Sequence, residues 1–222
     1  MRTRTGGRVN ASMIAFRRGG QAVFCEATKH LAKVEPRLGV VIRDVGPHRL
    51  APRRGRYAAL CRSIVGQQLS TKAANTIHSR FKSACGGWVT PARVSALSDD
   101  ELRSAGFSRS KIASVRDLTR AVEKGDLRLD RLGQLDNEAV AAKLLPIRGI
   151  GPWSVDMFLM FVLGRPDILP VGDLGIQNAL ARLHRLRERP APERMLALTQ
   201  SWRPYRSVGS WYLWRGLETD LW

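Results

Sequence analysis

Residues 145–173 contain two chemical groups that together suit a reaction on a nucleic acid. The first is a glycine turn, Gly149-Ile150-Gly151, which lies between two apolar helical patterns. The second is a carboxylate, Asp173, in a loop bounded by proline and glycine. Glycines let a phosphate approach backbone N–H groups closely, and a carboxylate can stabilise positive charge that develops on a sugar. Since the chain has a formal net charge of +18, we expect chemistry on DNA.

The composition favours nucleic acid over the other partners of a basic protein. The chain has 37 Lys and Arg against 19 Asp and Glu, and most of the cations are Arg, whose planar fork holds phosphate oxygens at two points. An anionic membrane or a very acidic protein are the alternatives, and some Arg excess can reflect genome base composition. No apolar run reaches the roughly 18 residues of a membrane span, so we expect no membrane partner.

The cysteine and histidine positions exclude two classes of metal site. Cys25, Cys61 and Cys85 contain no CxxC pair, which argues against a zinc ribbon or a cysteine-bound iron–sulfur cluster. Three unpatterned thiols fit a reducing compartment, and we expect a bacterial cytosolic protein. The four histidines are scattered and have neither zinc nor triad spacing.

The periodicity predicts an all-α fold. Ser70, Ser98 and Ser108 have the positions of helix N-caps, and Glu101 stands at capping-box spacing from Ser98. No run of alternating β-branched residues predicts a strand. The expected helices cover residues 23–34, 36–45, 57–65, 71–84, a segment from 98, 108–125, 137–145, a segment from 152, 174–186, 193–202 and 204–217.

Two segments fall outside these helices. Residues 1–20 are rich in Arg and lack acids, which favours a disordered basic arm over a transit peptide, since no amphipathic period is sustained. Residues 47–56 form a basic linker. We expect residues 21–222 to form the folded region, with the hairpin motif at about 137–164.

A bare Gly-x-Gly predicts an ordinary helix–turn–helix connection, so its context decides the interpretation. Here Gly149-Ile150-Gly151-Pro152-Trp153-Ser154 is followed by Asp173, preceded by GQQLSTKAA at 66–74, and followed by WRPYRSVGSWYLW at 202–214. In these three ordered motifs the chain resembles the helix-hairpin-helix DNA glycosylases, most of all the alkylated-base branch, 3-methyladenine DNA glycosylase II. The resemblance implies a two-lobed helical fold with a cleft between the lobes, in a compact form that lacks an N-terminal β-domain.

The resemblance also implies which chemistry is available. Bifunctional members of the superfamily have a Lys where this chain has Trp153, and that amine forms a Schiff base that leads to strand cleavage. Because Trp has no such amine, we expect a monofunctional enzyme that uses water and leaves an abasic site. Asp173 is the expected catalyst, although a plain helix N-cap is the usual role of an Asp before a helix. The two roles are compatible.

Base recognition is expected to rest on aromatic faces. Trp153 and Trp214 correspond to aromatic positions that line the family's base pocket, where electron-rich rings would stack on a cationic alkylated purine. Both are also candidates for ordinary core tryptophans. Met157 stands where a representative member has a pocket Tyr, so a hydroxyl is lost and the damage spectrum is in doubt.

The remaining site residues belong to two loops. Gln67-Gln68-Leu69 corresponds to the wedge loop that fills the gap left by a flipped base, with Gln68 as the plug; in the alternative, Leu69 is core and both Gln are solvated. The hairpin residues Gly149, Ile150 and Gly151 would bind phosphate. By resemblance alone, the backbone carbonyls of Leu145, Ile147 and Ile150 would hold a structural Na⁺ or K⁺, and no other cofactor is expected.

The sequence leaves three functions open. The first is a monomeric glycosylase that removes alkylated purines from double-stranded DNA in base excision repair. The second is a non-catalytic helix-hairpin-helix DNA-binding protein, which would need no carboxylate at position 173. The third keeps the fold and acts on a different damaged base, although the missing Lys and the missing cysteine cluster disfavour oxidised purines and mismatched adenine respectively.

Overall fold

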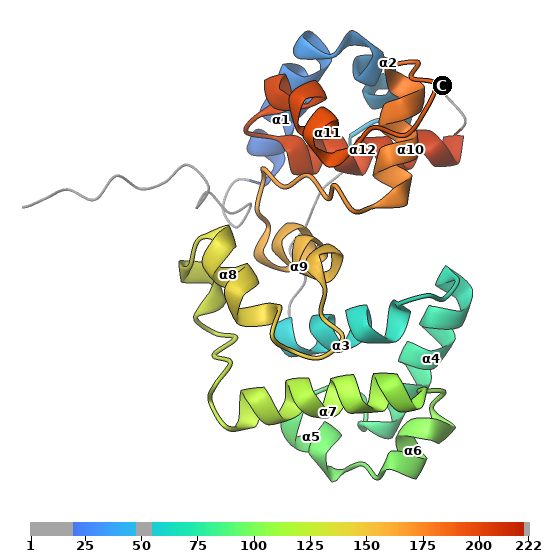
Figure 1. Cartoon of the computed structure of the whole chain (residues 1–222), viewed down its shortest axis with the longest axis vertical. Helices are drawn as coiled ribbons and strands as arrows, with labels where there is room; N and C mark the ends of the chain where they lie inside the picture. The colour runs from blue at the N-terminus through green and yellow to red at the C-terminus, as the bar shows by residue number, and fades with distance from the viewer. Residues whose placement is uncertain (1–19, 48–54, 220–222) are drawn as a thin grey trace, which may run out of the picture. The chain divides into compact units, whose positions relative to one another are not determined.

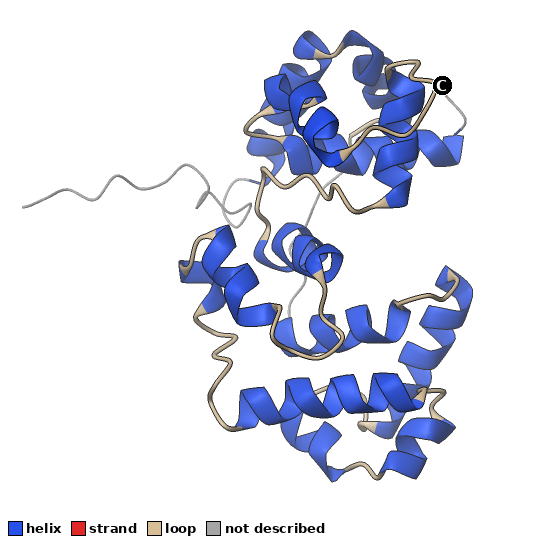
Figure 2. Cartoon of the chain, in the orientation of Figure 1, coloured by secondary structure: helices blue, strands red, loops and turns tan. Residues whose placement is uncertain are grey.

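The computed structural model describes residues 20–47 and 55–219, and these residues form helices and loops without a strand (Figure 2). The prediction of an all-α fold is therefore confirmed. The basic arm and most of the linker lie outside the described residues. None of the described helices combines the length and the apolarity that a membrane span requires. The chain divides into two compact units, Met1–Ala51 with Gly164–Trp222 as the first unit and Pro52–Leu163 as the second.

The second unit contains the hairpin and the helices that support it (Figure 1). Its long helix α7 packs against α3, α5 and α6, while α3 also packs against α4 and α9. The buried core includes Leu60, Ile64, Val115, Leu118 and Phe158. The elements are α3 (Arg56–Gly66), α4 (Thr71–Ala84), α5 (Pro91–Ala96), α6 (Asp99–Ser104), α7 (Arg109–Glu123), the short 3₁₀ turn η2 (Leu132–Gln134), α8 (Asn137–Leu144), α9 (Pro152–Phe158) and the π-helical turn η3 (Leu159–Leu163).

Side-chain caps fix where the helices of this unit begin. Ser70 accepts a hydrogen bond from the Ala73 N–H, and Ser108 caps α7 in the same way. Ser98 and Glu101 form a complete capping box, in which each side chain accepts from the other residue's backbone N–H. The cap positions expected from the sequence are confirmed.

The first unit is built around its last helix, α12. This helix packs against α1, α2 and α10, and it is buried on nearly every side, so small residues such as Ser207, Gly209 and Ser210 alternate with Val208 and Leu213. The Tyr212 hydroxyl donates to the Gly46 carbonyl at 2.9 Å. The elements are α1 (Gly20–Val34), α2 (Pro36–Val45), α10 (Leu174–Leu183), α11 (Pro192–Leu198), the 3₁₀ turn η4 (Gln200–Trp202) and α12 (Arg206–Thr219).

The structure differs from the helices expected from the sequence at four points. The short helix α5 (Pro91–Ala96) was not expected, although Thr90 caps it and Pro91 begins it. Helix α10 ends at Leu183 rather than at 186, because Arg185 adopts a left-handed backbone conformation (φ 53°). The expected helix 193–202 is α11 followed by the 3₁₀ turn η4, and α12 begins at Arg206, two residues after the predicted start.

We predict that Gly209→Ala destabilises the first unit. A Cβ on Gly209 would collide with the ring of Trp202, which is completely buried. Overpacking of this kind costs about 1–3 kcal/mol, and we expect the upper part of that range because the buried Trp202 ring has no space to shift. The loss then exceeds the gain of about 1 kcal/mol in helix propensity. Thermal unfolding followed by circular dichroism measures the loss. Gly66→Ala, in helix α3, is the control because its nearest neighbour would be the Ala74 Cβ at 4.0 Å. Equal melting temperatures for Gly209→Ala and the parent would contradict this packing.

Candidate functional site

The turn between α8 and α9 is held against α7. Gly149 has a left-handed backbone (φ 77°), and a Cβ there would collide with Ser114 of α7. The Arg148 N–H donates to Asp117 Oδ2 at 2.9 Å, and Asp117 also lies on α7. Glycine is therefore required at position 149 both by the backbone angle and by the close approach of a neighbouring helix.

The turn is also held by the wedge loop. Gln67 Nε2 donates to the Gly149 carbonyl at 2.6 Å and to Ser154 Oγ at 3.3 Å. Within the turn, the Ile150 N–H donates to the Ile147 carbonyl at 3.0 Å, and both side chains are buried. Gly151 is the N-cap of α9, and Pro152 takes its first position as expected. Backbone N–H groups at such a helix start favour an anion.

The three residues of the predicted wedge loop, Gln67, Gln68 and Leu69, differ in their exposure to solvent. Gln67 is half-buried and its amide is engaged with the hairpin, so the side chain positions the turn. Gln68 is exposed with a left-handed backbone (φ 58°), and Leu69 is 37% exposed. The alternative interpretation, with Leu69 in the core and both Gln solvated, is therefore wrong. The role of Gln68 as the plug stays a prediction.

A lysine anchors the end of α3, just before this loop. Lys111 on α7 donates from Nζ to the Val65 carbonyl at 2.7 Å. Partial burial lowers the pKa of Lys111 below its usual value. Because Lys111, Ser114 and Asp117 are spaced three residues apart, they lie on one face of α7. That face holds the wedge loop and the hairpin in a fixed relation.

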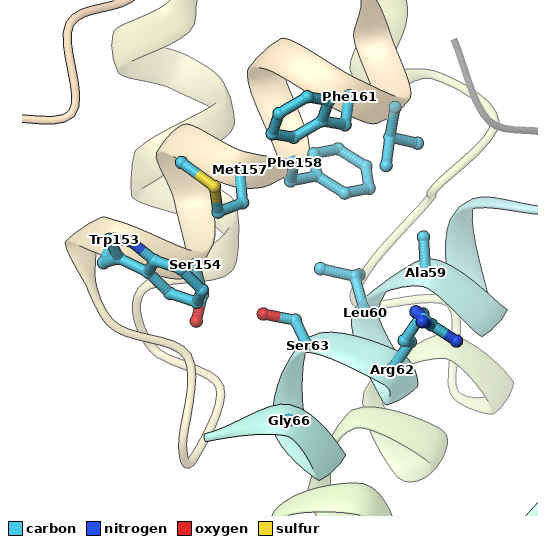
Figure 3. A pocket seen from close by; sticks show the side chains of 11 residues that line it. Ala59, Leu60, Arg62, Ser63, Gly66, Trp153, Ser154, Met157, Phe158 and Phe161 are labelled. Carbon is cyan, nitrogen blue, oxygen red and sulfur yellow. The ribbon is translucent and has the colours of Figure 1, made fainter. Parts of the chain in front are cut away.

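A cavity of about 230 Å³ lies beside the hairpin, between α3 and the helical run α9–η3 (Figure 3). Two of the predicted pocket residues, Trp153 and Met157, line it together. Trp153 is 40% exposed, so it is not an ordinary core residue. The volume lies below the roughly 300–1,000 Å³ of sites for drug-sized ligands and suits a single small ring system. The other lining residues are Ala59, Leu60, Arg62, Ser63, Gly66, Ser154, Phe158, Phe161 and Val162.

The predicted catalyst, Asp173, lies in the first unit as the N-cap of α10. Its Oδ1 accepts hydrogen bonds from the Ile176 N–H at 2.9 Å and from Trp214 Nε1 at 3.0 Å. The side chain is half-buried, so it is not sealed in the interior. The third predicted pocket residue, Trp214, therefore contacts the carboxylate through its indole N–H. The N-cap role, which was the alternative for Asp173, is observed.

The loop that carries Asp173 is anchored to the start of α12. Arg206 pairs with Asp167, with 2.6 Å between Nε and Oδ1. Ser207 Oγ donates to the Arg165 carbonyl at 2.7 Å and accepts from the Ile168 N–H at 2.9 Å. The same helix carries Trp214, so both ends of the loop are fixed by α12.

Sequence reasoning did not find four residues of these sites: Ser63, Lys111, Asp117 and Asp167. Asp117 and Asp167 are ordinary acids in the sequence, and their partners lie 31 and 39 residues away. Ser63 lines the cavity four residues before Gln67, but serine on a helix carries no local signal of function. Only the three-dimensional contacts distinguish these residues.

We predict that Gly149→Ala destabilises the second unit. A left-handed non-glycine residue that also collides with Ser114 is expected to cost about 2–4 kcal/mol. Gly151→Ala is the matched control, since a Cβ at Gly151 has nothing within 4 Å. Thermal unfolding of the two variants should show a large loss for the first and a small one for the second, and equal losses would contradict the observed turn.

Burial of Asp156, on α9, makes the free energy of unfolding depend on pH. Burial raises the pKa of this carboxyl to about 6 from its ordinary value of 3.8. The folded state therefore holds its proton longer than the unfolded state, so stability falls as the pH rises from about 4 to 6 and stays lower above that range.

We predict that Asp156→Asn raises the free energy of unfolding above pH 6. The expected gain is about 1–2 kcal/mol, which allows for the screening of a partly exposed group, and it should vanish near pH 4. Urea unfolding at pH 4, 5, 6 and 7.5 measures it, with the exposed Asp126→Asn as control. A gain that is constant with pH would show that the ionised carboxylate is not the cause.

The comparisons with known proteins agree with this arrangement. Residues 61–204 match the model of the HhH-GPD superfamily base excision DNA repair proteins, and the chain belongs to this superfamily. DNA-3-methyladenine glycosylase 1 of Schizosaccharomyces pombe is 34% identical over 196 residues, which cover 86% of each chain. The Bacillus subtilis protein YfjP is 38% identical over 169 residues, and the matched region spans 59% of its length.

Solved structures show the same fold. The S. pombe 3-methyladenine DNA glycosylase Mag1, in complex with abasic DNA, has a TM-score of 0.80 and 33% identity, covering 89% of this chain and 98% of that one. A DNA-3-methyladenine glycosidase from Bacillus halodurans has a TM-score of 0.76 and 35% identity, covering 87% and 90%. The expected family and its two-unit helical fold are therefore confirmed.

Proposed function

We propose that the protein is a monofunctional DNA glycosylase that removes alkylated purines of the 3-methyladenine type in base excision repair. The observation that carries the proposal is the half-buried Asp173, which caps α10 while its Oδ1 is held by the Trp214 indole. An aspartate that only caps a helix needs the bond from the Ile176 N–H, whereas Asp173 also accepts a bond from the Trp214 indole. Relatives named as 3-methyladenine glycosylases in two bacteria and a yeast support the substrate class.

The reaction is a hydrolysis of the N-glycosidic bond. The bond between the sugar C1′ and the purine nitrogen breaks, its electron pair leaves with the cationic base, and an oxocarbenium-like sugar forms. The Asp173 carboxylate stabilises that positive charge and takes a proton from the water that adds to C1′. An alkylated purine is already a good leaving group, so no strong general acid is needed. The products are the free base and an abasic site.

Because residue 153 is Trp, we expect no strand cleavage after the base is released. A lyase step requires an amine that attacks C1′ and forms a Schiff base. Trp153 supplies an aromatic face to the cavity instead. The N–H groups of Gly149 and Gly151 would bind a backbone phosphate, while the Ile150 N–H donates to the Ile147 carbonyl within the turn. The exposed Gln68 would fill the gap that the extruded base leaves in the duplex.

We propose, from the family resemblance, that the hairpin holds a monovalent cation through backbone oxygens. The turn offers the backbone carbonyls of Leu145, Ile147 and Ile150, and the Ile147 carbonyl uses one of its two lone pairs on the Ile150 N–H. Oxygen ligands suit a hard Na⁺ or K⁺. When bound, the cation would add positive charge at the turn, which would favour binding of a phosphate. Among the described residues no group of three His, Cys, Asp or Glu side chains could hold another metal.

We propose further that the enzyme acts as a monomer on double-stranded DNA in the bacterial cytosol, where the chromosome lies. A net charge of +18 supports phosphate contacts along the duplex and predicts binding that weakens steeply with salt. The two alternative functions, a non-catalytic DNA-binding protein and a glycosylase for another damaged base, are distinguished by the same assay of released bases.

We predict that Asp173→Asn abolishes base release and retains DNA binding. Asparagine remains an acceptable N-cap, so the fold is kept while the negative charge is lost. Methylated DNA is incubated with the variant and the free bases are separated by chromatography, while affinity for a duplex with an abasic-site analogue is measured by fluorescence anisotropy.

The matched control is Asp136→Asn. Asp136 caps α8 by the same bond, from the Ala139 N–H to Oδ1 at 2.7 Å, and it should retain full activity. Release of 3-methyladenine by Asp173→Asn at the parent rate would refute the catalytic role. Absence of any released base from the parent enzyme, with strong DNA binding, would favour the non-catalytic alternative.

A further inference from the structure

The hydroxyl of Ser63 is unusual among the polar groups that line the cavity. Ser63 lies on α3, and its Oγ exposes less than 1 Å² yet has no hydrogen-bond partner. Figure 3 shows this hydroxyl directed toward the space beside Trp153 and Met157. A buried hydroxyl without a partner costs free energy, so its orientation calls for a compensating contact when the cavity is filled.

Ser63 has a local partner available and does not use it. A helical Ser or Thr commonly donates back to the carbonyl four residues earlier. Three residues of this unit do so: Thr76 to Lys72 at 3.1 Å, Ser114 to Ser110 at 3.0 Å and Thr119 to Val115 at 2.6 Å. Ser63 does not make this bond, so its hydroxyl at the cavity wall has no hydrogen-bond partner.

The other polar side chains around the cavity are engaged. Ser154 Oγ accepts from Gln67 at 3.3 Å, and the Arg62 guanidinium donates to Asn75 Oδ1 at 2.7 Å. The rest of the described lining is apolar or aromatic. A ring that stacks in this cavity therefore meets Ser63 as the side chain with an unused acceptor.

We propose that Ser63 is a specificity-determining residue that accepts a hydrogen bond from the exocyclic amino group of the extruded purine. This inference rests on the proposed function. A purine that carries an alkyl group on a ring nitrogen is positively charged, so its amino N–H bonds are strong donors and its remaining ring nitrogens are weak acceptors. Met157 on the facing helix has no hydroxyl, so Ser63 supplies the polar contact from the opposite wall.

The test compares Ser63→Ala with the parent enzyme and with Ser83→Ala, which removes the same atom from an exposed position on α4 of the same unit. Single-turnover release of 3-methyladenine from methylated DNA should fall by about three- to tenfold in Ser63→Ala, the range of one ordinary hydrogen bond, and not in Ser83→Ala. Affinity for a duplex with an abasic-site analogue, which has no base, should not change.

Two further readouts separate recognition from a structural role. Ser63→Ala should melt at the parent temperature or a few degrees above it, because the substitution removes an unpaired buried hydroxyl and favours the helix. Ser63→Thr, which keeps the hydroxyl, should retain more of the parent rate than Ser63→Ala does. A lower melting temperature together with weaker binding to abasic-site DNA would show a structural role and overturn the proposal.

The outcomes also separate this inference from the proposed function. If the parent releases 3-methyladenine and Ser63→Ala releases it equally fast, the inference fails and the glycosylase stands. If Ser63→Ala instead loses release of hypoxanthine, which presents a carbonyl oxygen where adenine has the amino group, the hydroxyl donates and the proposed acceptor role is wrong. If the parent releases no base at all, the proposed function itself fails.

Discussion

The close approach of the hairpin backbone to α7 is the constraint on which the second unit depends. Gly149 has no side chain where Ser114 stands, and the Arg148 N–H is satisfied by Asp117. Gln67 then joins the same turn to the end of α3 through the Gly149 carbonyl. These contacts fix the start of α9, because a helix that begins at a clamped turn cannot rotate about its own axis.

The cavity follows from that fixed start. Trp153 and Met157 are one helical turn apart on α9, so they share a face, and the position of the turn decides that this face looks toward α3. In the first unit, Arg206 and Ser207 hold the loop before α10 in a similar way. In both units a predicted site residue, Trp153 or Asp173, lies at the start of a helix, and polar contacts from another helix hold the segment that leads into it. Function at such positions needs little movement on binding.

The sequence predicted the parts of this fold that local chemistry encodes. Helix α4 begins and ends where the Ser70 cap and the glycines at 86 and 87 indicated, and the capping box at Ser98 formed as expected. Helix α10 ended early because Arg185 takes a conformation usual for Gly or Asn, which no sequence pattern announces. The candidate site was predictable where a motif lies in one stretch, as for the hairpin. Ser63 was not, since its significance comes from residues about 90 positions away.

In the proposed recognition, the aromatic cavity would provide affinity for a flat ring, and the unpaired Ser63 hydroxyl would provide discrimination between rings. Stacking on Trp153 would attract any flat cationic ring but cannot strongly reject a ring that differs by one polar group. A buried polar group does reject such a ring, because an occupant without the matching donor leaves it unsatisfied while also excluding water. The unpaired Ser63 Oγ therefore lowers the stability of the empty protein so that discrimination is available when the cavity is filled. Lower stability in exchange for selectivity is common at functional sites, because the side chains that stabilise a fold best are often not those that discriminate between ligands.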